Sequence, residues 1–194
     1  GSLEKSIIIE TDSGYMNPMD VRSCYGESKR MGENLCKCYQ HQYQIPARAV
    51  RPSHTYGPTM DLKEDKRVFS EFVSNVVEGQ DIIIKSDGSA RRNFCYIADA
   101  VHGYFKILLD GEPGEAYNVA NMEGSKTIRE LAELLVQLYP ERHLSVVFEK
   151  RNDSYLENQY KVHPVHDTGK LQKMGWNCCF SVADGFKRTV QSFL

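Results

Sequence analysis

Residues 22–33 of this chain read RSCYGESKRMGE and place a tyrosine and a lysine four positions apart, Tyr25 and Lys29. The composition from Tyr25 to Tyr43 predicts a helix, on which positions i and i+4 share a face, so the phenol and the ammonium group project together. A neighbouring cation stabilises a phenolate and allows a tyrosine to act as a base near neutral pH. The alternative is an exposed pair on a solvated helix. In a chain with 11 tyrosines, a tyrosine and a lysine four positions apart also arise by chance.

Composition and charge describe an ordinary folded protein. Hydrophobic residues make up 41% of the 194 positions, enough for one domain with a core or for two small lobes. The net charge of −2 gives no electrostatic reason to expect nucleic acid or a membrane surface as a partner. The apolar runs are too short to span a bilayer, and the first residues do not resemble a signal peptide.

The six cysteines do not follow the spacing of a zinc knuckle, and no CxxC occurs. His163 and His166 have only Asp167 nearby as a further ligand, so we interpret both histidines as surface residues. We therefore expect no metal. Reduced thiols in a cytoplasmic protein are the simplest interpretation of the cysteines.

Helical and strand-like stretches alternate along the chain and predict an α/β or α+β class. Strands are expected at 47–50, 81–85, 116–119 and 144–148. Helices are expected at 25–43, 68–77, 97–109, 127–138, 168–173 and 182–193. The sequence before the first helix does not supply the strands of a parallel sheet, so that helix has no evident sheet to cover.

Further motifs accompany the tyrosine–lysine pair. They are Asn17-Pro18, RPSHTYGP at 51–58, DGSARRNFCYIAD at 87–99, Tyr117-Asn118-Val119, and Lys170-Leu171 with MGW at 174–176. Their order and spacing resemble the extended short-chain dehydrogenase/reductase family, specifically its NAD-dependent nucleotide-sugar epimerases, dehydratases and decarboxylases. The branch that the chain resembles most is that of the UDP-glucuronate decarboxylases. The resemblance covers nearly the whole chain.

The resemblance implies two sets of site residues. Tyr25 and Lys29 are the implied catalytic pair, and they contact the cofactor NAD together with Pro52 and Ser53. The residues implied to contact a UDP- or dTDP-linked sugar are His54, Arg67, Val68 and Arg92.

Two of these substrate contacts have alternatives. Arg92 stands where the family binds the diphosphate, and the guanidinium fork suits phosphate because it forms two parallel charge-assisted bonds. A structural arginine in an ion pair is the other interpretation of Arg92. His54 stands where the family usually has Asn, so its role is open between the sugar site and an ordinary loop histidine.

The implied fold is an incomplete Rossmann remnant, comprising the active-site helix and the last strands, with a small mixed α/β substrate-binding domain. Residues 1–52 are predicted to belong to the Rossmann part and 53–194 mainly to the substrate domain, with 97–119 returning to the Rossmann side. The family's GxxGxxG turn, which receives the NAD pyrophosphate, does not occur in the sequence. Neither Thr11 nor Ser13 has the strand-end setting of the family's catalytic Ser or Thr. We therefore expect a C-terminal part of an enzyme that binds NAD poorly and is inactive alone.

For the intact enzyme, the resemblance implies that Tyr25 takes the proton of the sugar C4 hydroxyl while hydride passes from C4 to NAD. The 4-keto sugar is then dehydrated, decarboxylated or epimerised, and this chain does not distinguish the three outcomes. In the family, the active-site helix also takes part in a homodimer. A second hypothesis is therefore a non-catalytic module that binds nucleotide sugar or dimerises through that helix.

Overall fold

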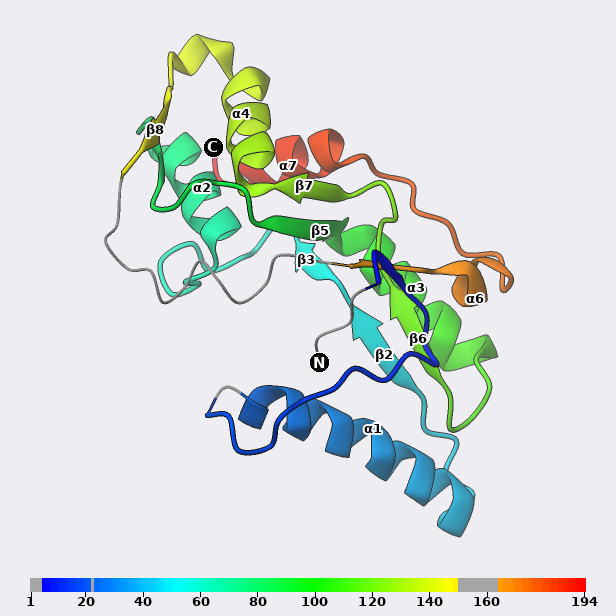
Figure 1. The fold of residues 1–194 in the computed structure, drawn as a ribbon. Coiled ribbons are helices and arrows are strands. Elements are labelled where there is room, and N and C mark those ends of the chain that lie inside the picture. The colour runs from blue at the N-terminus through cyan, green and yellow to red at the C-terminus, as the bar shows by residue number, and fades with distance from the viewer. Residues whose placement is uncertain (1–4, 22, 150–163) are drawn as a thin grey trace.

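The computed structural model describes residues 5–21, 23–149 and 164–194 (Figure 1). Helices and strands alternate along them, which confirms the predicted α/β class. The helices are α1 Ser23–Tyr43, α2 Val68–Glu78, α3 Ile97–Asp110, α4 Ile128–Leu138, α6 Gly169–Gln172 and α7 Val182–Gln191, with a 3-10 turn at Pro140–Arg142. The strands are β1 Ile7–Ile8, β2 Ala49–Pro52, β3 His54–Tyr56, β4 Ile82–Ile84, β5 Arg91–Tyr96, β6 Ala116–Val119, β7 Ser125–Thr127, β8 Val146–Phe148 and β9 Val165–His166.

The described strands form four small sheets. Strand β2 pairs in parallel with β6, β4 with β8, and β1 with β9. In the three-stranded sheet, β5 lies between the parallel strand β3 and the antiparallel strand β7. The β2–β6 register ends with Pro52 opposite Val119, so both strands end at the same edge. Helix α3 packs against this pair of strands.

The main core lies between the three-stranded sheet and helices α2, α4 and α7 (Figure 1). Its centre is aromatic, because Tyr56 stacks on Phe186 with ring centroids 3.9 Å apart and Phe94 meets Phe186 edge-on. Helix α2 buries one apolar face here, with Phe69, Phe72, Val73 and Val76. Gly79 then ends α2 in the left-handed conformation, as glycine allows without steric cost.

A second, smaller cluster lies beside α3 and β6. Its buried members are Cys95, Ala100, Ile107, Tyr117, Val119, Leu171 and Trp176. The Trp176 indole N–H donates to the carbonyl of Asp99 at 3.0 Å. The buried Asp99 carboxylate accepts from the backbone N–H groups of Cys179 and Phe180. These bonds fasten the segment before α7 to the first turn of α3.

Five of the described strands, β1, β3, β5, β7 and β9, were not predicted, and β2, β4 and β8 begin later than predicted. Strand β5 starts with Arg91-Arg92-Asn93 and β7 is Ser-Lys-Thr, so neither shows an apolar alternation along its length. The strand predicted at 47–50 begins at Ala49, because the Ala47 N–H donates to the Ile45 carbonyl in a tight turn. The domain boundary at residue 53 stays a prediction.

Helix α1 is packed differently from the other long helices. Of its 21 residues only Ser23 is buried. Its apolar side chains face solvent, with Met31 58%, Leu35 48% and Tyr39 49% exposed. Helix α1 therefore buries little apolar surface.

Candidate functional site

The structure brings Tyr25 and Lys29 together on α1. The Lys29 Nζ lies 5.4 Å from the centroid of the Tyr25 ring, and Tyr25 is 71% exposed. A Cβ added to Gly26 would lie 2.3 Å from the Met16 Cε, so a larger residue at this position would displace the flexible end of the Met16 side chain. The phenol and the ammonium group are therefore side by side and accessible, while their catalytic role stays a prediction.

Tyr25 and Lys29 line a cleft of about 590 Å³ beside α1. Segment 12–16 and the strands β2 and β6 contribute its other walls. The α1 residues that recur every four positions along it are Tyr25, Lys29, Glu33 and Lys37. The cleft gives the pair a concave surrounding in which a ligand is able to bind.

Pro52 and Ser53 lie at the end of β2, where the sequence predicts contact with the cofactor. The Ser53 N–H donates to the Val119 carbonyl at 3.0 Å. The Ser53 hydroxyl is buried and has no hydrogen-bond partner among the described residues. Buried hydroxyls are normally bonded, so this one is suited to a ligand atom. The contact of Pro52 and Ser53 with the nicotinamide end of NAD stays a prediction, and the sequence has no glycine-rich turn for the pyrophosphate.

His54 and Arg92 lie on the neighbouring strands β3 and β5. His54 is opposite Phe94 in register, and its exposed ring packs against the rings of Phe94 and Phe69. Arg92 is half-buried, donates from Nη1 to the Arg91 carbonyl, and has its pKa lowered by burial. An arginine remains charged despite such a shift, so β5 presents a partly desolvated cation that suits an anionic ligand.

Arg67 is already engaged within the chain. Its Nε donates to Asp65 Oδ1 at 2.9 Å and its Nη2 to Asp65 Oδ2 at 2.7 Å. These bonds hold the pKa of the Asp65 carboxyl below its usual value. The guanidinium also lies over the Phe69 ring. Val68 is the first residue of α2 and is half-buried, and the implied contacts of both residues with the nucleotide stay predictions.

The sequence did not single out the ion pair between Glu33 and Arg51. Arg51 donates from Nε and Nη2 to the two oxygens of Glu33, at 2.7 Å and 2.6 Å. Its Nη1 donates to the Glu10 carbonyl at 2.9 Å. The features of the sequence that could have pointed to this pair are the position of Glu33 one turn beyond Lys29 and the position of Arg51 directly before Pro52.

The interpretation of His166 as a surface residue is wrong. His166 lies in β9, and burial together with the nearby Arg51 cation lowers its pKa from the ordinary value, while Glu10 opposes the shift. It lies opposite Ile8 of β1 in register, is half-buried, and its buried Nδ1 has no partner among the described residues. His163 lies outside the described residues.

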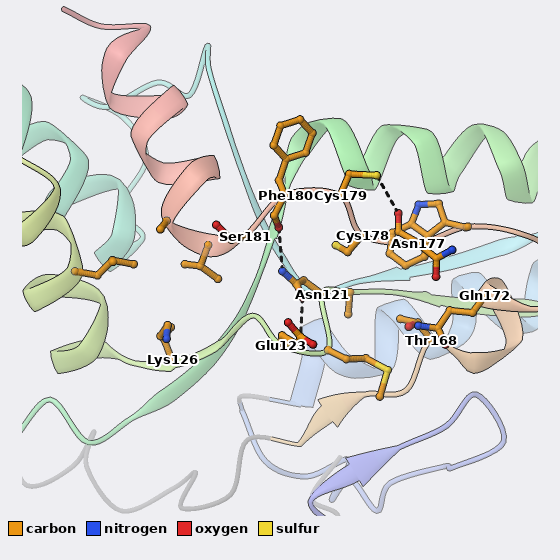
Figure 2. Close-up of a pocket in the computed structure, with 16 residues that line it drawn as sticks. Asn121, Glu123, Lys126, Thr168, Gln172, Asn177, Cys178, Cys179, Phe180 and Ser181 are labelled. Carbon is orange, nitrogen blue, oxygen red and sulfur yellow. Dashed lines mark hydrogen bonds between the residues drawn. The ribbon is translucent and has the colours of Figure 1, made fainter.

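A second cavity, of about 500 Å³, is lined by the β6–β7 connection and by the segment that leads to α7 (Figure 2). Asn121 lines this cavity. Its side-chain amide donates to the Phe180 carbonyl, and its side-chain oxygen accepts from the Glu123 N–H. None of the site residues predicted from the sequence lines this cavity. We therefore assign the proposed chemistry to the cleft at Tyr25.

All six cysteines are free. Within residues 5–21, 23–149 and 164–194, no three His, Cys, Asp or Glu side chains gather in a way that would hold a metal ion. In the same part of the chain, every helix is too short or too polar to traverse a bilayer. The cytoplasmic location stays a prediction.

Comparison with known proteins finds the NAD dependent epimerase/dehydratase family over residues 4–120. UDP-glucuronic acid decarboxylase 6 of Arabidopsis thaliana is 38% identical over 125 residues, 64% of this chain and 36% of the relative. UDP-glucuronic acid decarboxylase 1 of Danio rerio is 30% identical over 181 residues, 93% of this chain and 41% of the relative. The dTDP-D-glucose 4,6-dehydratase of Mus musculus is 29% identical, covering 97% of this chain and 55% of the relative.

Solved structures share the fold. The UDP-glucose 4-epimerase of Thermotoga maritima, solved with UDP-glucose, matches 87% of this chain and 52% of its own at a TM-score of 0.75 and 23% identity. DesIV, a dTDP-glucose 4,6-dehydratase of Streptomyces venezuelae solved with NAD, matches 100% of this chain and 56% of its own at a TM-score of 0.72 and 24% identity. The chain thus spans about half the length of these proteins or less. Since the family match extends over more than half of its residues, the chain belongs to the NAD-dependent epimerase/dehydratase family.

Proposed function

We propose that this chain is the C-terminal part of an NAD-dependent enzyme that oxidises a nucleotide sugar at C4. The observation that carries the proposal is the accessible Tyr25 phenol beside the Lys29 ammonium group on one helix face. Tyr25 accepts the proton of the C4 hydroxyl, and Lys29 stabilises the phenolate. NAD, when bound, supplies the acceptor for the C4 hydride. Pro52 and Ser53 hold the nicotinamide end together with the catalytic pair.

The nucleotide sugar is bound from the three-stranded sheet and the start of α2. We assign the diphosphate to Arg92, the sugar to the surroundings of His54, and the base to Arg67 and Val68. The half-buried guanidinium of Arg92 supports this assignment, because a partly desolvated cation binds phosphate more strongly than a fully hydrated one. The Thermotoga maritima relative was solved with UDP-glucose, which supports the same class of ligand.

Among the three fates of the 4-keto sugar, we favour decarboxylation of UDP-glucuronate. Both relatives cited above at 30% identity or more are UDP-glucuronic acid decarboxylases, one from a plant and one from a fish. Oxidation of a glucuronate at C4 gives a β-keto acid, which loses its carboxylate without a further acid–base pair. The 4,6-dehydratase and the 4-epimerase reactions are the alternatives.

Nucleotide binding tests the substrate assignment. We expect UDP and UDP-glucuronate to raise the Tm of the chain by several degrees at about 100 times Kd. Arg92→Ala is expected to abolish this rise. Arg91→Ala is the matched control, because Arg91 is exposed and paired with Glu130, and it should preserve the rise. Absence of a Tm shift with both uridine and thymidine diphosphates would reject the proposed nucleotide-sugar site.

Calorimetric titration with NAD tests the partial-enzyme interpretation. We expect negligible binding and no turnover of UDP-glucuronate, because the sequence has no GxxGxxG turn. Tight stoichiometric binding of NAD would contradict this expectation.

A non-catalytic dimerisation module is the second candidate function. The observation that favours it is the row of exposed apolar side chains on α1.

A further inference from the structure

The face of α1 that carries the catalytic pair continues for two more turns and reaches the sheet there. Glu33 and Lys37 follow Tyr25 and Lys29 at the four-residue spacing that keeps side chains on one helix face. Glu33 bridges to Arg51 of β2, and Lys37 bridges to a carboxylate just before β6. One end of this face therefore holds the proposed chemistry, and the other end is attached to the sheet.

The attachment through Arg51 has a defined geometry. The guanidinium binds both Glu33 oxygens and also donates to the Glu10 carbonyl, so Nε, Nη1 and Nη2 all have partners. A planar fork of this kind holds a carboxylate in one orientation, whereas an ammonium group accepts many. The side chains of Arg51 and Glu33 are only 30% and 32% exposed, so solvent screens their attraction less than that of a surface pair.

The second ion pair between α1 and the sheet region is weaker. The Lys37–Glu115 pair is longer, at 3.4 Å, and its side chains are 57% and 45% exposed. Burial contributes little, because only Ser23 of α1 is buried. The orientation of α1 about its own axis thus depends more on the Arg51–Glu33 pair than on apolar packing.

We propose that Arg51 is a positioning residue that acts through Glu33. By fixing the rotation of α1, it sets the direction in which Tyr25 and Lys29 point. The chemical meaning of this role rests on the proposed function, but the orientation of the helix is measurable without any ligand.

Hydrogen exchange of the whole chain tests the attachment. In Arg51→Ala we expect the α1 amides to exchange about tenfold faster, while the α2 amides are unchanged. Arg51→Lys should give an intermediate rate, because it keeps the charge and loses the fork. Lys85→Ala is the matched control, since Lys85 forms a 2.6 Å ion pair with Glu71 away from α1, and it should leave α1 exchange unchanged.

A spectroscopic signal of Tyr25 tests the orientation itself. With fluorotyrosine incorporated and Tyr25→Phe used for assignment, the Tyr25 fluorine resonance should move in Arg51→Ala and in Glu33→Gln, while that of buried Tyr56 stays. Unchanged α1 exchange in Arg51→Ala, equal increases in α1 and α2, or an unmoved Tyr25 resonance would each overturn the proposal. Neither measurement uses a nucleotide. A failure of nucleotide binding would therefore reject the proposed function without affecting the test of the Arg51 role.

Discussion

Phe186 lies at the centre of the main core, where its ring is fully buried against Tyr56 and Phe94. Phe186→Ala leaves a cavity that the surrounding rings fill only in part, so we expect the free energy of unfolding to fall by about 3–5 kcal/mol. Phe105→Ala is the control, because Phe105 is 57% exposed on α3 and should change stability by less than about 0.5 kcal/mol. Urea denaturation measures both variants, and equal losses would contradict the assignment of the core.

His166 gives the stability a pH dependence. Its pKa in the folded chain is lowered from 6.5, first by burial and then by Arg51, with Glu10 opposing. The unfolded chain therefore binds the proton at a higher pH than the folded chain. The stability contributed by neutral His166 is complete above pH 6.5 and is lost as the pH falls from there towards the folded pKa.

Thermal unfolding between pH 7.5 and 5.5 measures this effect. We expect the Tm of the chain to fall across that range, and the Tm of His166→Asn to fall less. The carboxyl groups with a lowered pKa, such as Asp65, lose their contribution to stability only at a lower pH. Parallel curves for the chain and the variant would show that His166 is not the cause.

At the scale of single residues, the sequence predicts contacts that depend on local spacing. Tyr25 and Lys29 meet because one helical turn brings them together, and that turn is visible in the sequence. Arg51 binds Glu33 of a different element, and its charge acts on His166 across more than a hundred positions. Such contacts depend on the tertiary path of the chain, so spacing gives no indication of them.

At the scale of elements, two helix glycines should respond to the same substitution with opposite signs. A Cβ on Gly185 of α7 would lie 2.2 Å from the Tyr56 hydroxyl oxygen, so Gly185→Ala should destabilise the chain by about 1–3 kcal/mol. A Cβ on Gly32 of α1 has no atom within 4 Å, so Gly32→Ala should stabilise α1 by about 0.5–1 kcal/mol. Chemical denaturation of the two variants decides this, and a loss for both would show that the surroundings of Gly32 are not open.

The sequence predicted helix α4 and strand β6 closely. Helix α4 begins within one residue of its predicted start, and Thr127 and Glu130 close its first turn as a capping box. Strand β6 agrees with the predicted 116–119. Strand β5 instead forms between β3 and β7, so its hydrogen bonds come from segments that lie far away in the sequence. Polar residues that become a strand through such pairing carry no periodic signal.

At the scale of the whole molecule, the exposed apolar face of α1 predicts self-association. We expect sedimentation equilibrium to show a dimer, and Leu35→Lys on α1 to shift it towards monomer. Leu109→Lys is the control, because Leu109 is 73% exposed on α3, and it should leave the dimer intact. A monomer at all concentrations, or dissociation only in Leu109→Lys, would contradict the prediction for α1.

The two hydrophobic clusters have a consequence for how unfolding is observed. The chain has one tryptophan, and Trp176 belongs to the smaller cluster beside α3. Its fluorescence therefore reports the melting of that cluster, whereas circular dichroism follows the helices of both. If the two curves separate under denaturant, the clusters unfold as separate cooperative units, and one transition midpoint no longer describes the molecule. Because the chain has a single indole in one of the two clusters, comparing its fluorescence with circular dichroism measures the cooperativity of unfolding.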